Sequence, residues 1–196
     1  MTLPPQEAET HATDVRLYEP FSALPGQVRV NATIAREVGN CFSNATNSPR
    51  DDGRRCFGVK SFVHDPCFAA FSNRATPTVC PDAPWGSEVI LMAVKENLGP
   101  LPVRTGGQQP VTEASSVGEL GGARAAWAVE LANGDRCLAT TGGTRTPRAA
   151  FAQVFDCKSG AVIAGAIDDA AAVWRVNYVR PRAEASTLVG VKTAWL

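Results

Sequence analysis

Six cysteines constrain this chain more than any other feature of its sequence. Each is close in sequence to one other, and each interval is about the length of a strand, a turn and a returning strand. An even cysteine count is typical of a disulfide framework, which persists in an oxidising compartment. Other connectivities stay open, but sequential pairing closes only short loops. We therefore expect a secreted or extracytoplasmic protein with the disulfides Cys41 to Cys56, Cys67 to Cys80, and Cys137 to Cys157.

Chain length and charge limit the kinds of protein that this sequence can encode. A chain of 196 residues with 44% hydrophobic content can bury a core and fits one large or two small domains. The 19 basic residues balance the 19 acidic ones, so no global field attracts nucleic acid or an anionic membrane. No apolar run approaches the roughly 20 residues of a spanning helix. We expect neither a nucleic-acid partner nor membrane insertion.

The alternation of apolar and polar residues predicts a mainly β fold with little helix. Trp127, Val129 and Leu131 alternate with smaller or charged residues, and Asn133-Gly134 then predicts a type I′ hairpin turn. The chain has 17 glycines and 14 prolines, which interrupt regular secondary structure at many points. Similar patterns predict strands at 28–36, 56–63, 89–94, 136–140, 149–157, 174–179 and 189–195. We expect two disulfide-linked antiparallel β lobes packed together.

The composition also suggests where the lobes begin and end. Residues 1–27 lack the apolar run of a signal peptide. We expect them to be a linker or tail after a removed signal peptide, lipobox or membrane anchor. Residues 28–96 form the expected first lobe with four cysteines, and residues 124–196 the second with two. Between them, residues 97–123 are rich in Gly, Pro, Gln, Thr and Ser, which indicates a linker or a functional loop.

The residues around the cysteines carry a family resemblance. The motifs are Gly39-Asn-Cys-Phe-Ser, Pro49-Arg-Asp-Asp-Gly-Arg-Arg-Cys56, Val63-His-Asp-Pro-Cys-Phe68, Val79-Cys-Pro-Asp-Ala-Pro-Trp85, Ala126-Trp-Ala-Val-Glu-Leu-Ala-Asn-Gly-Asp-Arg-Cys137, Trp174-Arg-Val-Asn-Tyr178 and Thr193-Ala-Trp195. Over residues 28–196 the chain resembles an uncharacterised secreted or lipoprotein-type domain of actinobacteria. That family has no established activity, so the resemblance implies a compartment and disulfides but no mechanism. Where relatives tend to carry an aromatic residue just before the last cysteine, this chain has Val154-Phe155-Asp156, which puts a Tyr-based site there in doubt.

Motifs for catalysis or metal binding are weak. Cys56, His64, Cys67 and Cys80 lack the close ligand pairs of a zinc site, so we expect no metal and no cofactor. A serine hydrolase would have to use His64, and no G-x-S-x-G elbow is present. The acid pairs Asp51-Asp52 and Asp168-Asp169 lack the spacing of an EF-hand calcium loop, and their clearest interpretation is solvated loop acids.

Two function classes remain. The favoured one is a non-catalytic extracytoplasmic module that binds a protein, glycan or envelope component. The alternative is a secreted hydrolase that uses His64 with a nearby acid, Asp65 or Asp168. Loops held by disulfides are preorganised for binding. We therefore predict a binding site at the loops of the first four cysteines, formed by Arg54, Arg55, His64, Asp65 and Trp85.

Overall fold

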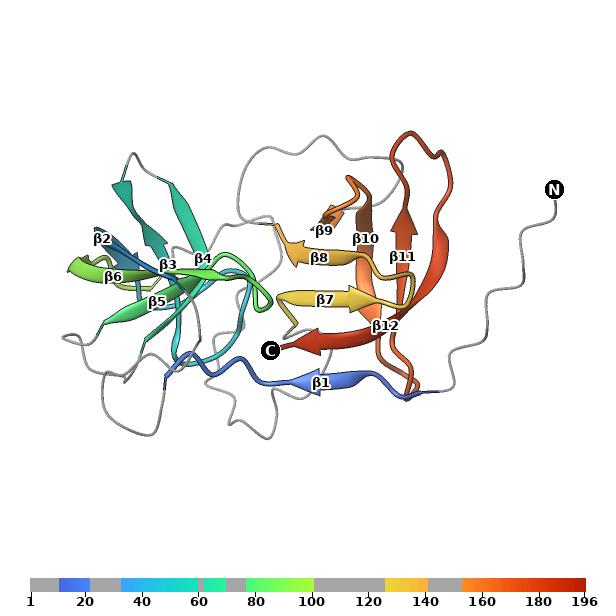
Figure 1. The fold of residues 1–196 in the computed structure, drawn as a ribbon, viewed down its shortest axis with the longest axis horizontal. Helices are drawn as coiled ribbons and strands as arrows, with labels where there is room; N and C mark the ends of the chain where they lie inside the picture. The colour runs from blue at the N-terminus through green and yellow to red at the C-terminus, as the bar shows by residue number, and fades with distance from the viewer. Residues whose placement is uncertain (1–10, 22–32, 60–61, 70–76, 101–125, 141–152) are drawn as a thin grey trace.

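The structure is a computed structural model that describes residues 11–21, 33–59, 62–69, 77–100, 126–140 and 153–196. The described residues are nearly all strands and turns and contain no α-helix, so the predicted mainly β class is confirmed. Two β bodies lie side by side, with β2 to β6 in one and β7 to β12 in the other (Figure 1). The described residues include no helix with the length and apolar character that a membrane crossing requires.

The first body is a closed five-stranded barrel. Its strands are β2 (Thr33–Phe42), β3 (Gly53–Phe57), β4 (Val63–Ala69), β5 (Thr78–Pro81) and β6 (Glu88–Asn97). Neighbouring strands are antiparallel except β2 and β6, which close the barrel in parallel. So narrow a barrel has room for few side chains. Its core consists of the two disulfides and the fully buried Met92, with Ile90 and Val94 packed against them.

The second body is a sheet of seven strands that also closes on itself. Strands β7 (Ala128–Leu131), β8 (Arg136–Ala139), β9 (Gln153–Cys157), β10 (Val162–Asp168), β11 (Arg175–Val179) and β12 (Thr187–Trp195) follow one another, and β12 pairs back onto β7. The short strand β1 (Asp14–Arg16) joins β12 in parallel. The core here is aliphatic and aromatic, and includes Leu131, Ile163, Val176 and Val191.

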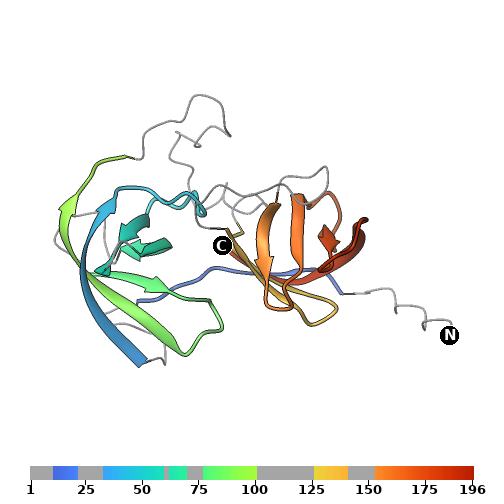
Figure 2. The same cartoon turned by 90° about the horizontal axis from the view of Figure 1, so that it is seen from above.

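A third apolar cluster joins the two bodies. Tyr18, which follows β1, packs its ring 5.4 Å from that of Phe68 on β4 and 5.4 Å from that of Trp127 before β7. All three side chains are buried, and burial raises the pKa of Tyr18 to about 12. The C-terminal end of β12 also lies between the bodies in both views (Figures 1 and 2). The segment after β1 therefore fills the junction between the barrels.

The three sequential disulfides are present as expected. The turn at Asn133-Gly134 does connect two strands, β7 and β8. It is not the expected type I′ turn, because Gly134 has a positive φ of 82° whereas Asn133 does not. Four strands were not expected: β1, β4, β5 and β10. The single strand expected over 56–63 is wrong, because β3 ends at Phe57 and β4 begins at Val63. Residues 14–18 thus belong to the folded unit, although the sequence assigned them to a tail, because their partners on β12 are far away in sequence. The 97–123 segment lies mostly outside the described residues.

Candidate functional site

Asp65 and Arg55, two of the expected binding residues, face each other at the β3–β4 pair. The Asp65 carboxylate is fully buried and lies 3.0 Å from the Arg55 guanidinium. It also accepts hydrogen bonds from the backbone N–H groups of Thr46 and Asn47. Burial raises the pKa of Asp65, and these N–H groups and the Arg55 charge partly oppose that shift. These contacts hold the loop between β2 and β3 in place. The polar atoms of Asp65 and Arg55 are therefore already engaged within the protein.

Arg54 is committed in a similar way. Its Nη1 donates to three backbone carbonyls, those of Ser43 at 2.8 Å, Asp51 at 2.9 Å and Gly53 at 2.7 Å. Burial lowers the pKa of Arg54, and the neighbouring Asp52 and Asp51 partly offset this. Carbonyl contacts of this kind fix the shape of a loop without presenting the guanidinium to a partner. The binding role of Arg54 stays a prediction.

His64 lies on the inner side of the first barrel, since its register partner on β3 is the buried Cys56. Its Nε2 is buried, lacks a hydrogen-bond partner, and is 3.8 Å from Glu37 Oε2. Glu37 also accepts a hydrogen bond from the Val59 N–H at 3.1 Å. Gly58 closes the space, because a Cβ there would come within 2.1 Å of Glu37 Oε2 and 3.0 Å of His64 Nε2. Within the described residues, no hydrogen bond or ion pair joins His64 to Asp65 or Asp168.

Trp85 lies apart from the other four expected binding residues. Its ring is 5.1 Å from that of Trp195 on β12, in an edge-on arrangement. The Arg136 guanidinium lies 5.4 Å from the centre of the same ring. Trp85 therefore packs against the second body instead of standing free as a ligand platform. The five residues do not form one surface, and whether any of them binds a partner stays a prediction.

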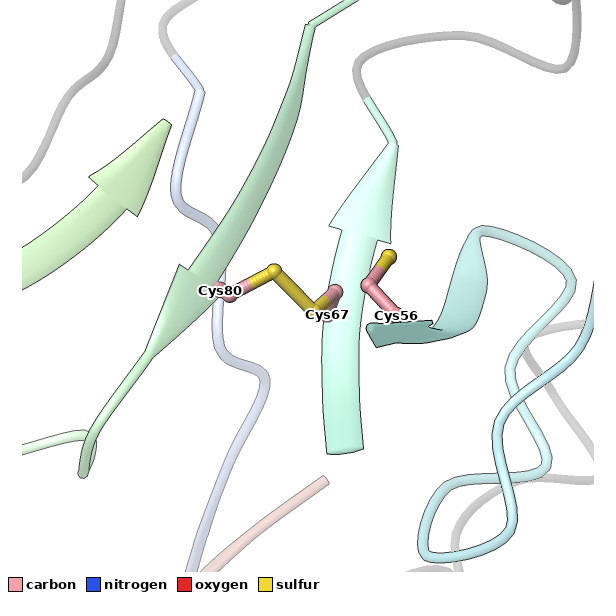
Figure 3. Close-up of side chains that lie close together, drawn as sticks. All are labelled: Cys56, Cys67 and Cys80. Atoms are coloured by element: carbon pink, nitrogen blue, oxygen red, sulfur yellow. A yellow bond between two sulfur atoms is a disulfide. The ribbon is translucent and has the colours of Figure 1, made fainter. Parts of the chain in front are cut away.

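The sulfur atoms in the first barrel resemble a metal site only by proximity. The Sγ atoms of Cys56, Cys67 and Cys80 lie within 4.8 Å of one another. In Figure 3 the Cys67–Cys80 bond joins two strands, and Cys56 lies on the strand next to that of Cys67. Cys56 is itself bonded to Cys41. Bonded sulfurs are not thiolates, so this cluster is a disulfide core and does not provide metal ligands.

A hydrogen-bonded network in the second barrel joins two turns and a strand. The Asp135 carboxylate accepts from Ser159 Oγ at 2.5 Å and from the Tyr178 hydroxyl at 2.9 Å. Partial burial raises the pKa of Asp135, but these hydrogen bonds outweigh it and the net shift is downward. The Ser159 and Tyr178 hydroxyls also lie 3.1 Å from each other, so the three side chains contact one another. The network is best explained as a structural contact that holds the β7–β8 turn and the β9–β10 turn against β11.

The acid pairs also have structural partners. Asp52 forms a bidentate ion pair with the buried Arg50, at 2.8 Å from Nε and 2.6 Å from Nη2. Asp168 accepts a hydrogen bond from the backbone of Ala170. Arg50 in addition donates to the carbonyls of Tyr18 and Leu196, and thus joins the first barrel to the second body. Asp51 and Asp52 lie in the turn before β3, as expected of loop acids, whereas Asp168 is the last residue of β10.

One exposed apolar cluster was missed by the sequence analysis. Val38 on β2 and Val59 and Phe62 at the β3–β4 connection are 61%, 55% and 68% exposed. At the two sides of this connection, Gly58 N–H donates to the Phe62 carbonyl and Phe62 N–H to the Val59 carbonyl. The hydrogen bond from Val59 to Glu37 holds this connection against β2, one residue from Val38. We call Val38, Val59 and Phe62 the hairpin surface. Its sequence signal, apolar residues on both sides of Lys60-Ser61, was interpreted as part of a single strand.

Comparisons with known proteins add no family to this picture. Models of protein families, curated proteins and solved structures were all searched, and none of them gives a significant match to the chain.

Proposed function

We propose that the protein is a non-catalytic binding module of the bacterial cell envelope or of a secreted protein, and that it engages its partner through the hairpin surface. The observation that carries the proposal is the exposure of Val38, Val59 and Phe62 at one place. Scattered apolar residues are common on protein surfaces, but neighbouring large ones typically mark interaction sites. The disulfide framework supports an oxidising compartment, and the three disulfides are consistent with an extracellular protein.

The scaffold is suited to this role. Two disulfides lie inside the first barrel, and the Glu37 carboxylate fixes the start of the β3–β4 connection. A turn that is already ordered loses less conformational entropy when a partner binds. The family resemblance supports an actinobacterial source and an extracytoplasmic location. Both remain part of the proposal.

A secreted hydrolase that uses His64 is the weaker alternative. Its support is the buried His64 Nε2 without a hydrogen-bond partner. Two observations weigh against this alternative. The Glu37 carboxylate, which lies near His64 Nε2, also accepts a hydrogen bond from the Val59 N–H. Asp65 is already bound by Arg55 and by backbone N–H groups. A general base needs a substrate proton within hydrogen-bond reach, and the closely packed Gly58 leaves little room beside His64.

The test is binding to an envelope extract of an actinobacterium. Immobilised protein is compared with the double variant Val59→Ser and Phe62→Ser, and with Leu188→Ser as the matched control. Leu188, on β12 of the second body, is 55% exposed, so its substitution changes surface polarity at a distant place. We expect the wild type and the control to retain the same components and the double variant to lose them. Equal retention by all three proteins would refute the assigned surface.

A further inference from the structure

Three sulfur atoms from two different disulfides lie together inside the first barrel. Cys56 on β3 is bonded to Cys41 on β2, and Cys67 on β4 is bonded to Cys80 on β5. The Sγ atoms of Cys56, Cys67 and Cys80 lie within 4.8 Å of one another, whereas the Cys41 sulfur does not belong to this group. One half of one disulfide is therefore a close neighbour of the whole of the other (Figure 3).

The core of the barrel keeps these sulfurs away from solvent. All four cysteines are buried in one cluster with Met92. A reductant therefore reaches them only when the barrel opens locally. A thiolate formed there faces the neighbouring disulfide at a short distance that the fold maintains. Internal exchange then competes well with a second attack by a reductant from solution.

The strand register shows how a disulfide could move within this group. Across the β3–β4 ladder Cys67 pairs with Arg54, two residues before Cys56, and the register is irregular between these two residues of β3. A bond from Cys56 to Cys67 therefore joins adjacent strands diagonally, where the ladder already departs from regular pairing. Diagonal neighbours are roughly 7 Å apart, at the upper end of what a disulfide spans, so the new bond draws the two strands slightly together.

We propose that Cys56, Cys67 and Cys80 form a thiol–disulfide exchange centre that releases Cys41 as a free thiol when the first barrel is partly reduced. This inference goes beyond the binding role and does not depend on it. A small dithiol attacks the Cys41 sulfur, forms a mixed disulfide with it and expels the Cys56 thiolate. The second thiol of the reductant then closes the reductant's own disulfide and releases Cys41, so two electrons pass from the dithiol to the protein.

The Cys56 thiolate next attacks the Cys67–Cys80 bond. A bond from Cys56 to Cys67 forms, the Cys67–Cys80 bond breaks, and Cys80 leaves as a thiolate that takes a proton from water; attack at Cys80 expels Cys67 instead. Reduction that begins at the Cys67–Cys80 bond leads to the same products, because the thiolate released there attacks Cys56 and expels Cys41. One disulfide thus remains among β3, β4 and β5. Strand β2, which carries one residue of the hairpin surface, loses its covalent link.

Two serine variants test the centre without any reductant. Cys41→Ser leaves a free thiol at Cys56, inside the group, and Cys56→Ser leaves one at Cys41, outside it. Each variant is incubated at neutral pH, quenched with acid to remove the thiolate, alkylated and mapped as non-reduced peptides. In Cys41→Ser we expect loss of the single native connectivity, with bonds from Cys56 to Cys67 or Cys80. In Cys56→Ser, the matched control, we expect alkylation of Cys41 alone.

The wild type provides an independent measurement that needs no substitution. It is treated with a limiting amount of dithiothreitol under native conditions, and circular dichroism verifies that it stays folded. Molecules that have lost one disulfide of the first barrel should carry an alkylated Cys41 beside a bond from Cys56 to Cys67 or Cys80. The disulfide of the second body is the internal control, because no third cysteine belongs to its group, and no peptide should link it to the first barrel.

Two results would overturn the exchange centre. The first is strict retention of the Cys67–Cys80 bond both in Cys41→Ser and in partly reduced wild type. The second is rearrangement in Cys56→Ser to the same extent as in Cys41→Ser, because position inside the group would then make no difference. If Cys41→Ser does not fold, the peptide map of the wild type decides.

Discussion

Replacement of Arg50 by Ala should destabilise the protein more than any other single arginine change in the described residues. The Arg50 side chain is only 9% exposed and lies with its guanidinium carbon 4.5 Å from the centre of the Phe68 ring. Nη1 donates at 2.6 Å to the Tyr18 carbonyl and at 3.2 Å to the Leu196 carbonyl. Nε and Nη2 bind Asp52. One side chain thus holds the loop before β3, the segment after β1 and the end of β12.

The loss of stability in Arg50→Ala can be estimated from these contacts. Two carbonyls lose a charged donor, at roughly 1 kcal/mol each or somewhat more. The Asp52 carboxylate is one-third exposed, so its lost ion pair adds about 1 kcal/mol at most. Loss of the contact with Phe68 adds about 0.5 to 1 kcal/mol. The free energy of unfolding should therefore fall by about 3 to 4 kcal/mol, a large share of the roughly 5 to 15 kcal/mol of a typical domain.

Urea unfolding of the disulfide-intact protein measures this loss. Arg50→Met is the informative companion, because it keeps an unbranched apolar side chain at this buried position and removes the guanidinium. It should lose about 2 to 3 kcal/mol. Arg16→Ala is the matched control: the Arg16 side chain is 58% exposed and pairs with Asp14, which is 51% exposed, so its loss should cost less than about 0.5 kcal/mol. Arg50 variants that unfold within about 0.5 kcal/mol of the wild type would refute the assigned role.

Three further predictions concern the disulfides and the carboxylates of Asp65 and Asp135. A strong reductant should lower the melting temperature sharply while EDTA leaves it unchanged, because each disulfide contributes on the order of 3 kcal/mol by the chain-entropy model; a large shift with EDTA alone would instead indicate a structural metal. Asp65→Ala should unfold at lower urea than Asp65→Asn, because alanine leaves two backbone N–H groups without their side-chain acceptor and removes the carboxylate partner of Arg55; equal midpoints would show that this acceptor is dispensable. The pKa of Asp135 is lowered by folding, so its stabilising contribution is present above the unfolded value of about 3.9 and is lost as the pH falls through the folded value. The gap in urea midpoint between the wild type and Asp135→Asn should therefore close in acid, and a constant gap from pH 7 to pH 2 would contradict the assignment.

Part of this protein can be predicted from its sequence because the relevant contacts are local. Each disulfide joins residues 13 to 20 positions apart, which is the span of one strand, its turn and its partner strand. Alternation of apolar residues identified most of the strands, and Asn133-Gly134 marked a true β7–β8 turn. Periodicity and turn residues act over a few positions, so a single sequence displays them.

The tertiary structure decided the features that depend on distant partners. Thr13 donates to the Val191 carbonyl across 178 positions, and Arg50 to the Leu196 carbonyl across 146. No local sequence pattern indicates such contacts. The sequence therefore predicts a tail where β1 lies, and it does not identify Arg50 as a structural residue. The same limit applies to the site. Sequence placed Arg54, Arg55 and Asp65 near one another, but only the tertiary structure shows that their polar atoms hold the loop between β2 and β3 while Val59 and Phe62 are exposed. Whether a side chain is exposed depends on how the elements pack, which one sequence does not display. For that reason the charged residues proved to hold a loop in place, and the apolar residues Val59 and Phe62 proved to be exposed.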